Sequence, residues 1–280
     1  MAVNKPLDKF IIKSFELRKK QHLKSVKILD CRWYLGNKKR GEDEFYESHI
    51  EGASFFDINN ISNKSSKLPH MLPTKKQFEL YIENLNIKHN DEIVVYDQCG
   101  YFSTARVWFT FTLFGFNKVR ILDGGIQDWI KKKLPVTSKI DSPKTRNTIK
   151  LTINNDMVIK KQKIIETIKN SKNNIQIIDA RPPKRFLGIE EEPRPGLKKG
   201  NINSSINIPF DSILRNNNYL LNLSDLKSLV RKKKITKTKE IICYCGSGVT
   251  ACNLIFVLKI LGFNKIKLYD GSWAEWGKIN

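Results

Sequence analysis

The sequence predicts an α/β protein made of two tandem domains, each with a central, mostly parallel sheet flanked by helices. The chain has 280 residues, enough for two ordinary domains, and its two halves can be aligned with each other. Each half also alternates short apolar runs with helical patterns. Runs such as "IVVY" and "IQII" suit parallel strands that helices cover on both faces.

Three pairs of segments carry the internal repeat. An apolar run that ends in Asp-x-Arg occurs once in each half, and the shared "GFNK" and "DGxxxxW" motifs fix the alignment. The matched segments are 26–33 with 175–182, 49–58 with 201–210, and 91–129 with 239–276.

The repeat places one domain at 1–140 and the other at 150–280. The polar segment 134–148 between them contains Pro135 and Pro143, which interrupt regular structure, and we interpret it as a linker.

The formal net charge of +22 requires a nucleic-acid partner to be considered. The lysines are spread evenly over both halves with no dense basic arm, so we expect no nucleic-acid binding. No apolar run approaches the ~18–20 residues of a membrane span, so we expect no membrane partner. Residues 1–20 are basic and amphipathic. Because Asp8 and Glu16 lie among them, a docked surface helix is favoured over a transit peptide.

Cysteine and histidine usage indicates a reducing compartment and no metal. Five cysteines without a secretory signal favour free thiols, and we expect a cytoplasmic location. The four histidines lack the spacing of zinc ligands, so we expect neither a metal nor another cofactor.

The motif "CGSGVTAC" (245–252) follows an apolar run and precedes a helical pattern. Together with "DARPPKRF" (179–186) and "EEPRPG" (191–196), it resembles the tandem-domain rhodanese family of sulfurtransferases, and among them the 3-mercaptopyruvate sulfurtransferases. The resemblance covers nearly the entire chain.

The resemblance implies that Cys245 is the nucleophile. In this family the loop amides form an anion-binding nest, and the following helix N-terminus adds positive charge, so both favour the thiolate. Such surroundings lower a thiol pKa from about 8.5 to roughly 3.5–7.5. We therefore predict an exposed, activated thiol in a loop that Gly246 and Gly248 allow to turn. The loop residues expected to bind the substrate are Gly246, Gly248, Val249 and Thr250.

The other cysteines near the two loops are expected to be structural rather than catalytic. Cys243 lies in the preceding strand and is expected to be buried, and Cys252 is expected to pack in the helix, with a resolving-thiol role as the alternative. In the first repeat Asp97 takes the position of Cys245, so we expect that domain to be catalytically silent. Cys99 remains an alternative second thiol.

Basic side chains decide the expected donor. No arginine or lysine lies within 245–252, so the loop lacks the cation that phosphatase chemistry needs. Thiosulfate-preferring relatives carry cationic residues just after the cysteine, so their absence here favours mercaptopyruvate over thiosulfate as the donor. Arg185 and Arg194 match the family pair that grips mercaptopyruvate, and we expect them to supply positive charge farther from the reacting sulfur. Arg181 is expected to be a structural partner of acidic groups. Residues 190–192 are expected to form a solvated acidic face.

The resemblance also implies a proton relay. It places Ser247 next to the chemistry and matches His70 to a family histidine that reaches this serine. The family's third member is an acid, whereas this chain has Asn59 there, with Asp57 two residues earlier. Which of these two residues supports His70 stays open.

The expected function is transfer of sulfur from 3-mercaptopyruvate through a Cys245 persulfide, with release of pyruvate. The acceptor is left open among thioredoxin, a small thiol and cyanide. The alternatives are a thiosulfate sulfurtransferase and a persulfide carrier in a sulfur relay, and the sequence leaves the oligomeric state undetermined.

Overall fold

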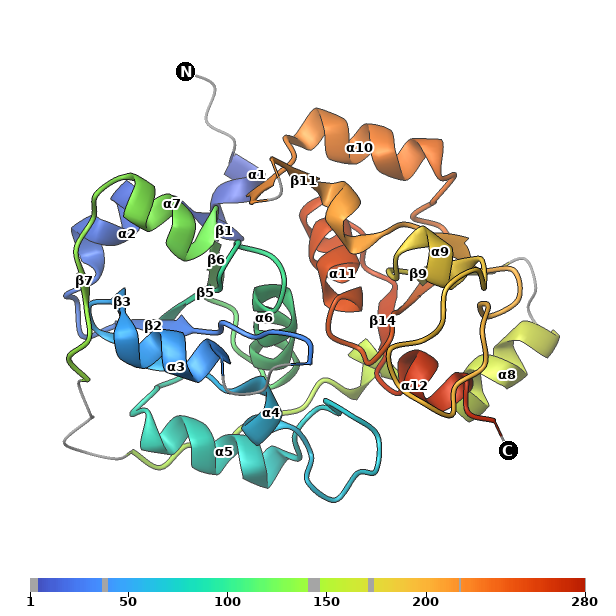
Figure 1. The fold of residues 1–280 in the computed structure, drawn as a ribbon, viewed down its shortest axis with the longest axis horizontal. Coiled ribbons are helices and arrows are strands. Elements are labelled where there is room, and N and C mark those ends of the chain that lie inside the picture. The colour runs from blue at the N-terminus through green and yellow to red at the C-terminus, as the bar shows by residue number, and fades with distance from the viewer. Residues whose placement is uncertain (1–4, 37–39, 141–146, 171–173, 217, 280) are drawn as a thin grey trace. The chain divides into compact units, whose positions relative to one another are not determined.

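The computed structural model describes residues 5–36, 40–140, 147–170, 174–216 and 218–279. They fall into two compact units, each a sheet covered by helices (Figure 1), which confirms the predicted fold class. Short segments group with the unit formed by the opposite half of the sequence. Unit 1 comprises residues 1–64, 72–154 and 215–220, and unit 2 comprises residues 65–71, 155–214 and 221–280.

Unit 1 contains a five-stranded sheet of order β1-β6-β5-β2-β4, in which every neighbouring pair is parallel. Strands β3 and β7 form a separate antiparallel pair. Helix α5 begins at a capping box, in which the Thr74 hydroxyl and the Gln77 side chain satisfy amide groups that the helix leaves open. The elements are α1 (Lys5–Asp8), β1 (Ile11–Ile12), α2 (Ser14–Lys20), β2 (Val26–Asp30), α3 (Arg40–Glu47), β3 (His49–Ile50), β4 (Ala53–Phe55), α4 (Ile58–Ile61), α5 (Lys75–Asn84), β5 (Glu92–Tyr96), α6 (Thr104–Leu113), β6 (Val119–Leu122), α7 (Gly125–Lys131) and β7 (Val136–Thr137).

Unit 2 repeats this sheet. Its strand order is β10-β9-β13-β14-β8, again with parallel neighbours. Strands β9, β13 and β14 take the places of β2, β5 and β6, as the sequence repeat predicts. The elements from this half of the sequence are η1 (Asn155–Met157), β8 (Val158–Ile159), α8 (Lys161–Asn170), β9 (Ile175–Asp179), α9 (Pro183–Phe186), β10 (Ile206–Asn207), η2 (Phe210–Ile213), β11 (Leu214–Arg215), β12 (Tyr219–Leu220), α10 (Leu223–Lys232), β13 (Glu240–Tyr244), α11 (Ala251–Ile260), β14 (Ile266–Tyr269) and α12 (Ser272–Trp276).

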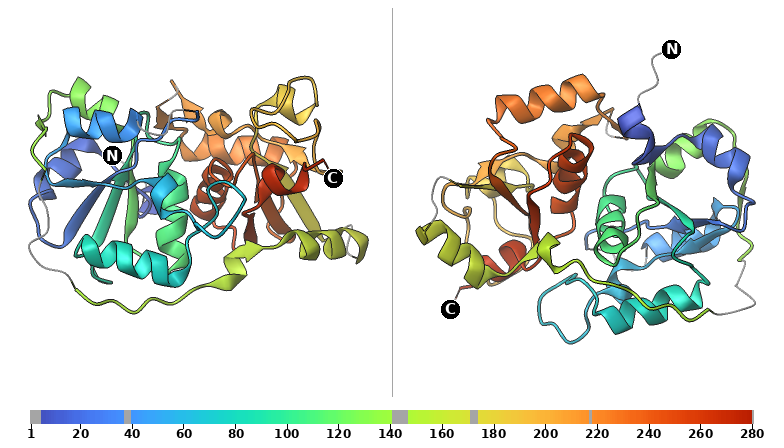
Figure 2. Two further views of the ribbon diagram at one scale, coloured as in Figure 1. Left: turned by 60° about the horizontal axis from the view of Figure 1, so that its bottom comes forward. Right: turned by 180° about the vertical axis from the view of Figure 1, so that it is seen from behind.

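Helices cover both faces of each sheet (Figure 2). In unit 1, α2, α3 and α7 pack on one face, where Leu17, Phe45 and Trp129 form a core with alternate strand residues. In unit 2, Ile164 of α8 and Trp273 of α12 pack on β13 in the same way. Burial on both faces explains why the central strands read as continuous apolar runs.

The N-terminal segment differs from the predicted surface helix. Ile11 and Ile12 are buried and pair with β6, so they extend the sheet between two short helices. An apolar pair beside an open sheet edge gains more from burial than from continuing a helix.

The predicted linker is partly ordered by unit 1. Its first part contributes β7. Residues 149–151, just after the predicted linker, run along α5, where the backbone N–H of Ile149 donates to Glu83 and that of Leu151 donates to Glu79. Residues 141–146, with Pro143, lie outside the described residues. Within the described ranges, none of the helices combines the length and apolarity that crossing a membrane requires.

Candidate active site

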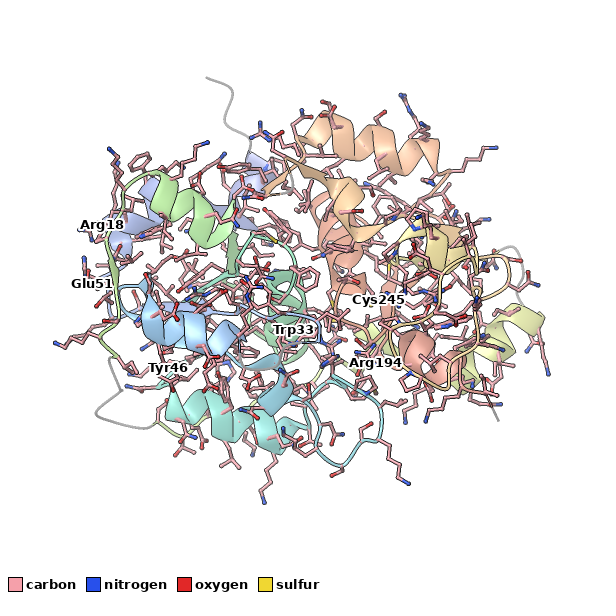
Figure 3. The ribbon with its side chains drawn as sticks, viewed as in Figure 1. Arg18, Trp33, Tyr46, Glu51, Arg194 and Cys245 are labelled. Atoms are coloured by element: carbon pink, nitrogen blue, oxygen red, sulfur yellow. The ribbon has the colours of Figure 1, made fainter. Side chains whose placement is uncertain are left out.

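Cys245 directly follows β13, the central strand of the unit 2 sheet, and α11 begins at Ala251. The start of the loop is anchored to α12. The Cys245 N–H donates to Ser272 Oγ at 3.2 Å, and the Cys245 carbonyl accepts the Trp273 N–H at 2.9 Å. The predicted strand–loop–helix arrangement around the thiol (labelled in Figure 3) is therefore present.

The loop amides are open to an anion. The N–H groups of Gly246, Ser247, Val249 and Thr250 donate to no acceptor within the part of the chain that the structure describes. Gly248 has a φ of +77°, a conformation that side chains disfavour. These donors and the N-terminus of the ten-residue helix α11 all favour negative charge on the adjacent sulfur.

The thiol is buried, whereas the sequence predicted an exposed one. Cys245 is only 2% exposed, because the loop packs against α12 and arginine side chains lie over Gly246. Cys243 is buried in the strand as predicted, and burial raises its pKa well above the usual value for a thiol. The Cys252 thiol donates to the Gly248 carbonyl at 3.3 Å, which is consistent with its expected packing role.

The equivalent loop of unit 1 closes around its own carboxylate. Asp97 accepts five backbone N–H groups, at distances that include 2.7 Å from Phe102 and 2.8 Å from Ser103. Burial, and secondarily Asp97, raises the pKa of Cys99 to about 12. This loop therefore has neither an open anion nest nor an activated thiol. The five amide donors belong to Cys99, Gly100, Phe102, Ser103 and Thr104.

Two arginines lie against the Cys245 loop. A Cβ atom built on Gly246 would lie 3.1 Å from Arg185 Nη2 and 3.8 Å from Arg194 Nη1. The missing side chain at position 246 lets both guanidinium groups approach the loop backbone. Burial lowers the pKa of Arg194, nearby Cys245 opposes this effect, and Arg185 adds to it.

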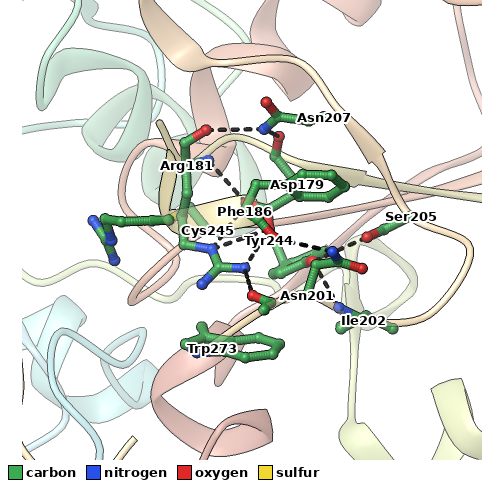
Figure 4. A network of polar contacts seen from close by, with 12 residues as sticks. Asp179, Arg181, Phe186, Asn201, Ile202, Ser205, Asn207, Tyr244, Cys245 and Trp273 are labelled. Atoms are coloured by element: carbon green, nitrogen blue, oxygen red, sulfur yellow. Dashed lines mark hydrogen bonds and ion pairs between the residues drawn. The ribbon is translucent and has the colours of Figure 1, made fainter. Parts of the chain in front are cut away.

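Arg181 belongs to the supporting structure, as predicted. Its guanidinium contacts Asp179 at 2.6 Å, donates to the Gly200 carbonyl at 2.7 Å and lies 4.3 Å from the centre of the Trp273 ring. Figure 4 shows this network beside Tyr244 and Cys245. The Asp-x-Arg motif thus ties the C-terminal end of β9 to the segment at Gly200.

Glu192 is a buried carboxylate next to the site, one that the sequence did not predict. We expected residues 190–192 to be solvated, but the Glu192 side chain is only 2% exposed and bridges Arg181 and Arg185. Its side chain is buried because it pairs with two arginines, and a buried carboxylate needs such partners.

The predicted serine–histidine pair is formed. His70 Nδ1 lies 3.0 Å from Ser247 Oγ, and both residues belong to unit 2. His70 has a φ of 57°, which is uncommon for a residue with a side chain. Asp57 caps α4 through the Asn59 N–H, and Asn59 Oδ1 accepts from the indole N–H of Trp33. Support of His70 by Asp57 or Asn59 stays a prediction.

Comparison with known proteins agrees with this geometry. The rhodanese-like domain model matches residues 15–132 and 163–279. The mouse (Mus musculus) 3-mercaptopyruvate sulfurtransferase is 37% identical, and the match covers 90% of this chain and 84% of that protein. The rat (Rattus norvegicus) thiosulfate sulfurtransferase is 34% identical, with 90% and 85% covered. The crystal structure of SseA from Escherichia coli, a 3-mercaptopyruvate sulfurtransferase structure, superposes with a TM-score of 0.85 at 30% identity over 95% of this chain and 99% of that one. The chain belongs to the family of proteins with rhodanese-like domains.

Proposed function

We propose that the chain is a sulfurtransferase that moves sulfur from 3-mercaptopyruvate to a thiol or cyanide through a persulfide on Cys245. The observation that carries this proposal is the contrast between the two loops. The unit 2 loop offers open amide donors beside a thiol, whereas Asp97 occupies the donors of the unit 1 loop. The names of the mouse and Escherichia coli relatives support the donor.

The first half-reaction takes sulfur from the donor. The Cys245 thiolate attacks the sulfur of mercaptopyruvate, an S–S bond forms, and the C–S bond breaks with its electron pair remaining on carbon. The resulting enolate of pyruvate takes up a proton and leaves. Ser247 and His70, 3.0 Å apart, are suited to move that proton.

The loop then holds the product of this step. The N–H groups of residues 246, 247, 249 and 250 and the α11 N-terminus stabilise the negatively charged outer sulfur of the persulfide. Arg185 and Arg194 bind the donor carboxylate, since guanidinium groups pair well with planar carboxylates.

The second half-reaction returns the enzyme to its resting state. The acceptor thiolate attacks the outer sulfur, the S–S bond to Cys245 breaks, and the Cys245 thiolate is released with its electron pair. The five free thiols suit a reducing compartment such as the expected cytoplasm.

Thiosulfate is the second candidate donor. The two guanidinium groups lie against Gly246, the residue after Cys245, so they bring positive charge to the loop that carries the reacting sulfur. The name of the rat relative, a thiosulfate sulfurtransferase, also supports thiosulfate as the donor.

Steady-state kinetics with each of the two donors test the proposal. The ratio of kcat/KM for mercaptopyruvate to that for thiosulfate is expected to be about 10², or about 2.7 kcal/mol of transition-state binding. A preference for thiosulfate would contradict the assigned donor. Pyruvate release that stops after one turnover with every small acceptor would instead indicate a carrier.

A further inference from the structure

The Glu192 carboxylate joins the structural and substrate-binding arginines of unit 2. One oxygen lies 2.6 Å from Arg181 Nη1, and the other pairs with Arg185 Nη2. The side chains of Glu192 and Arg181 are almost fully buried, and that of Arg185 is 15% exposed. Because Asp179 holds Arg181 from its other side, Glu192 is a rigid anchor for Arg185.

The Arg185 guanidinium also lies next to the Cys245 loop. Nη2, the atom that pairs with Glu192, lies beside Gly246 as well, and the Nε atom is buried without a hydrogen-bond partner among the described residues. A buried donor that lacks an acceptor is costly, so an incoming anion beside Gly246 gains by pairing with it.

Of the three arginines near the Cys245 loop, one has no carboxylate partner in the described part of the chain. Asp179 compensates Arg181, and Glu192 compensates Arg185. Arg194 lies next to the same loop and forms no ion pair or hydrogen bond within the described ranges of the chain. The charges of these five side chains therefore add up to a single positive charge beside the Cys245 thiolate. A second negative charge on the donor is then left uncompensated, which favours a monoanion over a dianion.

We propose that Glu192 is a positioning and specificity-determining residue: it fixes Arg185 and cancels its charge, so that the loop favours a monoanionic carboxylate donor over dianionic thiosulfate. The inference rests on the proposed sulfurtransferase function and assigns its donor selectivity to a residue outside the loop. Mercaptopyruvate is monoanionic near pH 7, since a thiol titrates near 8.5.

The test compares Glu192→Gln with Glu191→Gln at pH 7. Both variants remove one charge, but Glu191 is 76% exposed and pairs with Lys199 at the surface. Glu192→Gln is expected to raise the thiosulfate-to-mercaptopyruvate ratio of kcat/KM about tenfold, because one added positive charge attracts a dianion more strongly than a monoanion. A rise below threefold relative to Glu191→Gln, including a proportional loss of both donors, overturns the proposal.

Inhibition of the unaltered enzyme provides a second test if Glu192→Gln does not fold. Sulfate and methanesulfonate differ by one charge and little in shape, and each is measured as a competitor of mercaptopyruvate. Sulfate is expected to bind less than tenfold more tightly than methanesulfonate, and a tenfold or greater advantage overturns the proposal. Pyruvate release by the unaltered enzyme is measured first. Its absence refutes the proposed function itself, whereas an active enzyme with an unshifted donor ratio refutes only the role of Glu192.

Discussion

Replacement of Asp97 by alanine tests whether the unit 1 loop is built around a carboxylate. The change removes the acceptor of five backbone N–H groups, and the Asp97 side chain is buried. Each buried donor left unpaired costs about 1–3 kcal/mol, and water reaches some of them once the loop relaxes. We therefore expect the free energy of unfolding of unit 1 to fall by about 4 kcal/mol, well beyond the usual effect of a point mutation.

Hydrogen exchange of peptides from unit 1 measures this loss separately from unit 2. Asp57→Ala is the matched control, because Asp57 accepts a single N–H at the start of α4 and its removal should cost about 1 kcal/mol. Added sulfate should recover part of the loss in Asp97→Ala by binding the vacated donors, and should leave Asp57→Ala unchanged. A loss below 1 kcal/mol in Asp97→Ala would refute the interpretation of this loop as a self-occupied anion site.

Three further changes test the site and the electrostatics of the fold. His70→Ala should lower kcat by about 10²-fold while persulfide remains detectable in a single turnover; unchanged steady-state rates would remove His70 from the mechanism. Arg194→Ala should weaken transition-state binding of mercaptopyruvate, measured from kcat/KM, by about the 2–5 kcal/mol lost when a charge-assisted contact is broken. An equal loss with thiosulfate would argue against a role of Arg194 in donor choice. Burial raises the pKa of Glu92, but hydrogen bonds from Lys20 and Arg120 outweigh it, so the folded-state pKa is lowered overall. The ionised Glu92 carboxylate therefore stabilises the fold at pH values above the ordinary carboxylate pKa of about 4.3. This stabilisation is lost as the pH falls through the lower pKa that Glu92 has in the folded protein. Glu92→Gln should therefore flatten the acid side of the stability curve measured by denaturant unfolding, and an unaltered pH dependence would contradict this assignment.

Local pattern and internal repetition predicted the fold well. The paired segments 91–129 and 239–276 form equivalent blocks, in which a strand, a loop, a helix, a second strand and a second helix follow one another. The apolar periodicity that defines such blocks depends on neighbouring residues, so it is visible in the sequence. The grouping of residues 65–71 with unit 2 and of 215–220 with unit 1 depends on contacts between distant residues, which periodicity does not encode.

The site was predicted in its composition and less well in its environment. The Cys245 loop, the Ser247–His70 pair and the two arginines were all identified from motifs. Motifs do not report burial, so the thiol was wrongly predicted to be exposed and Glu192 was assigned to a solvated face. The buried position of Glu192 depends on its pairing with Arg181 and Arg185, 11 and 7 residues away, which no local pattern reports.

Single-turnover sulfur transfer to Cys245 tests the central claim most directly. The protein is incubated with mercaptopyruvate without an acceptor, released pyruvate is quantified, and the cysteine-containing peptides are weighed by mass spectrometry. The proposed function predicts one pyruvate per chain, one added sulfur atom on the Cys245 peptide and none on the Cys99 peptide, with Cys245→Ser inactive. Pyruvate release that persists in Cys245→Ser, or sulfur found on Cys99 instead, would contradict it.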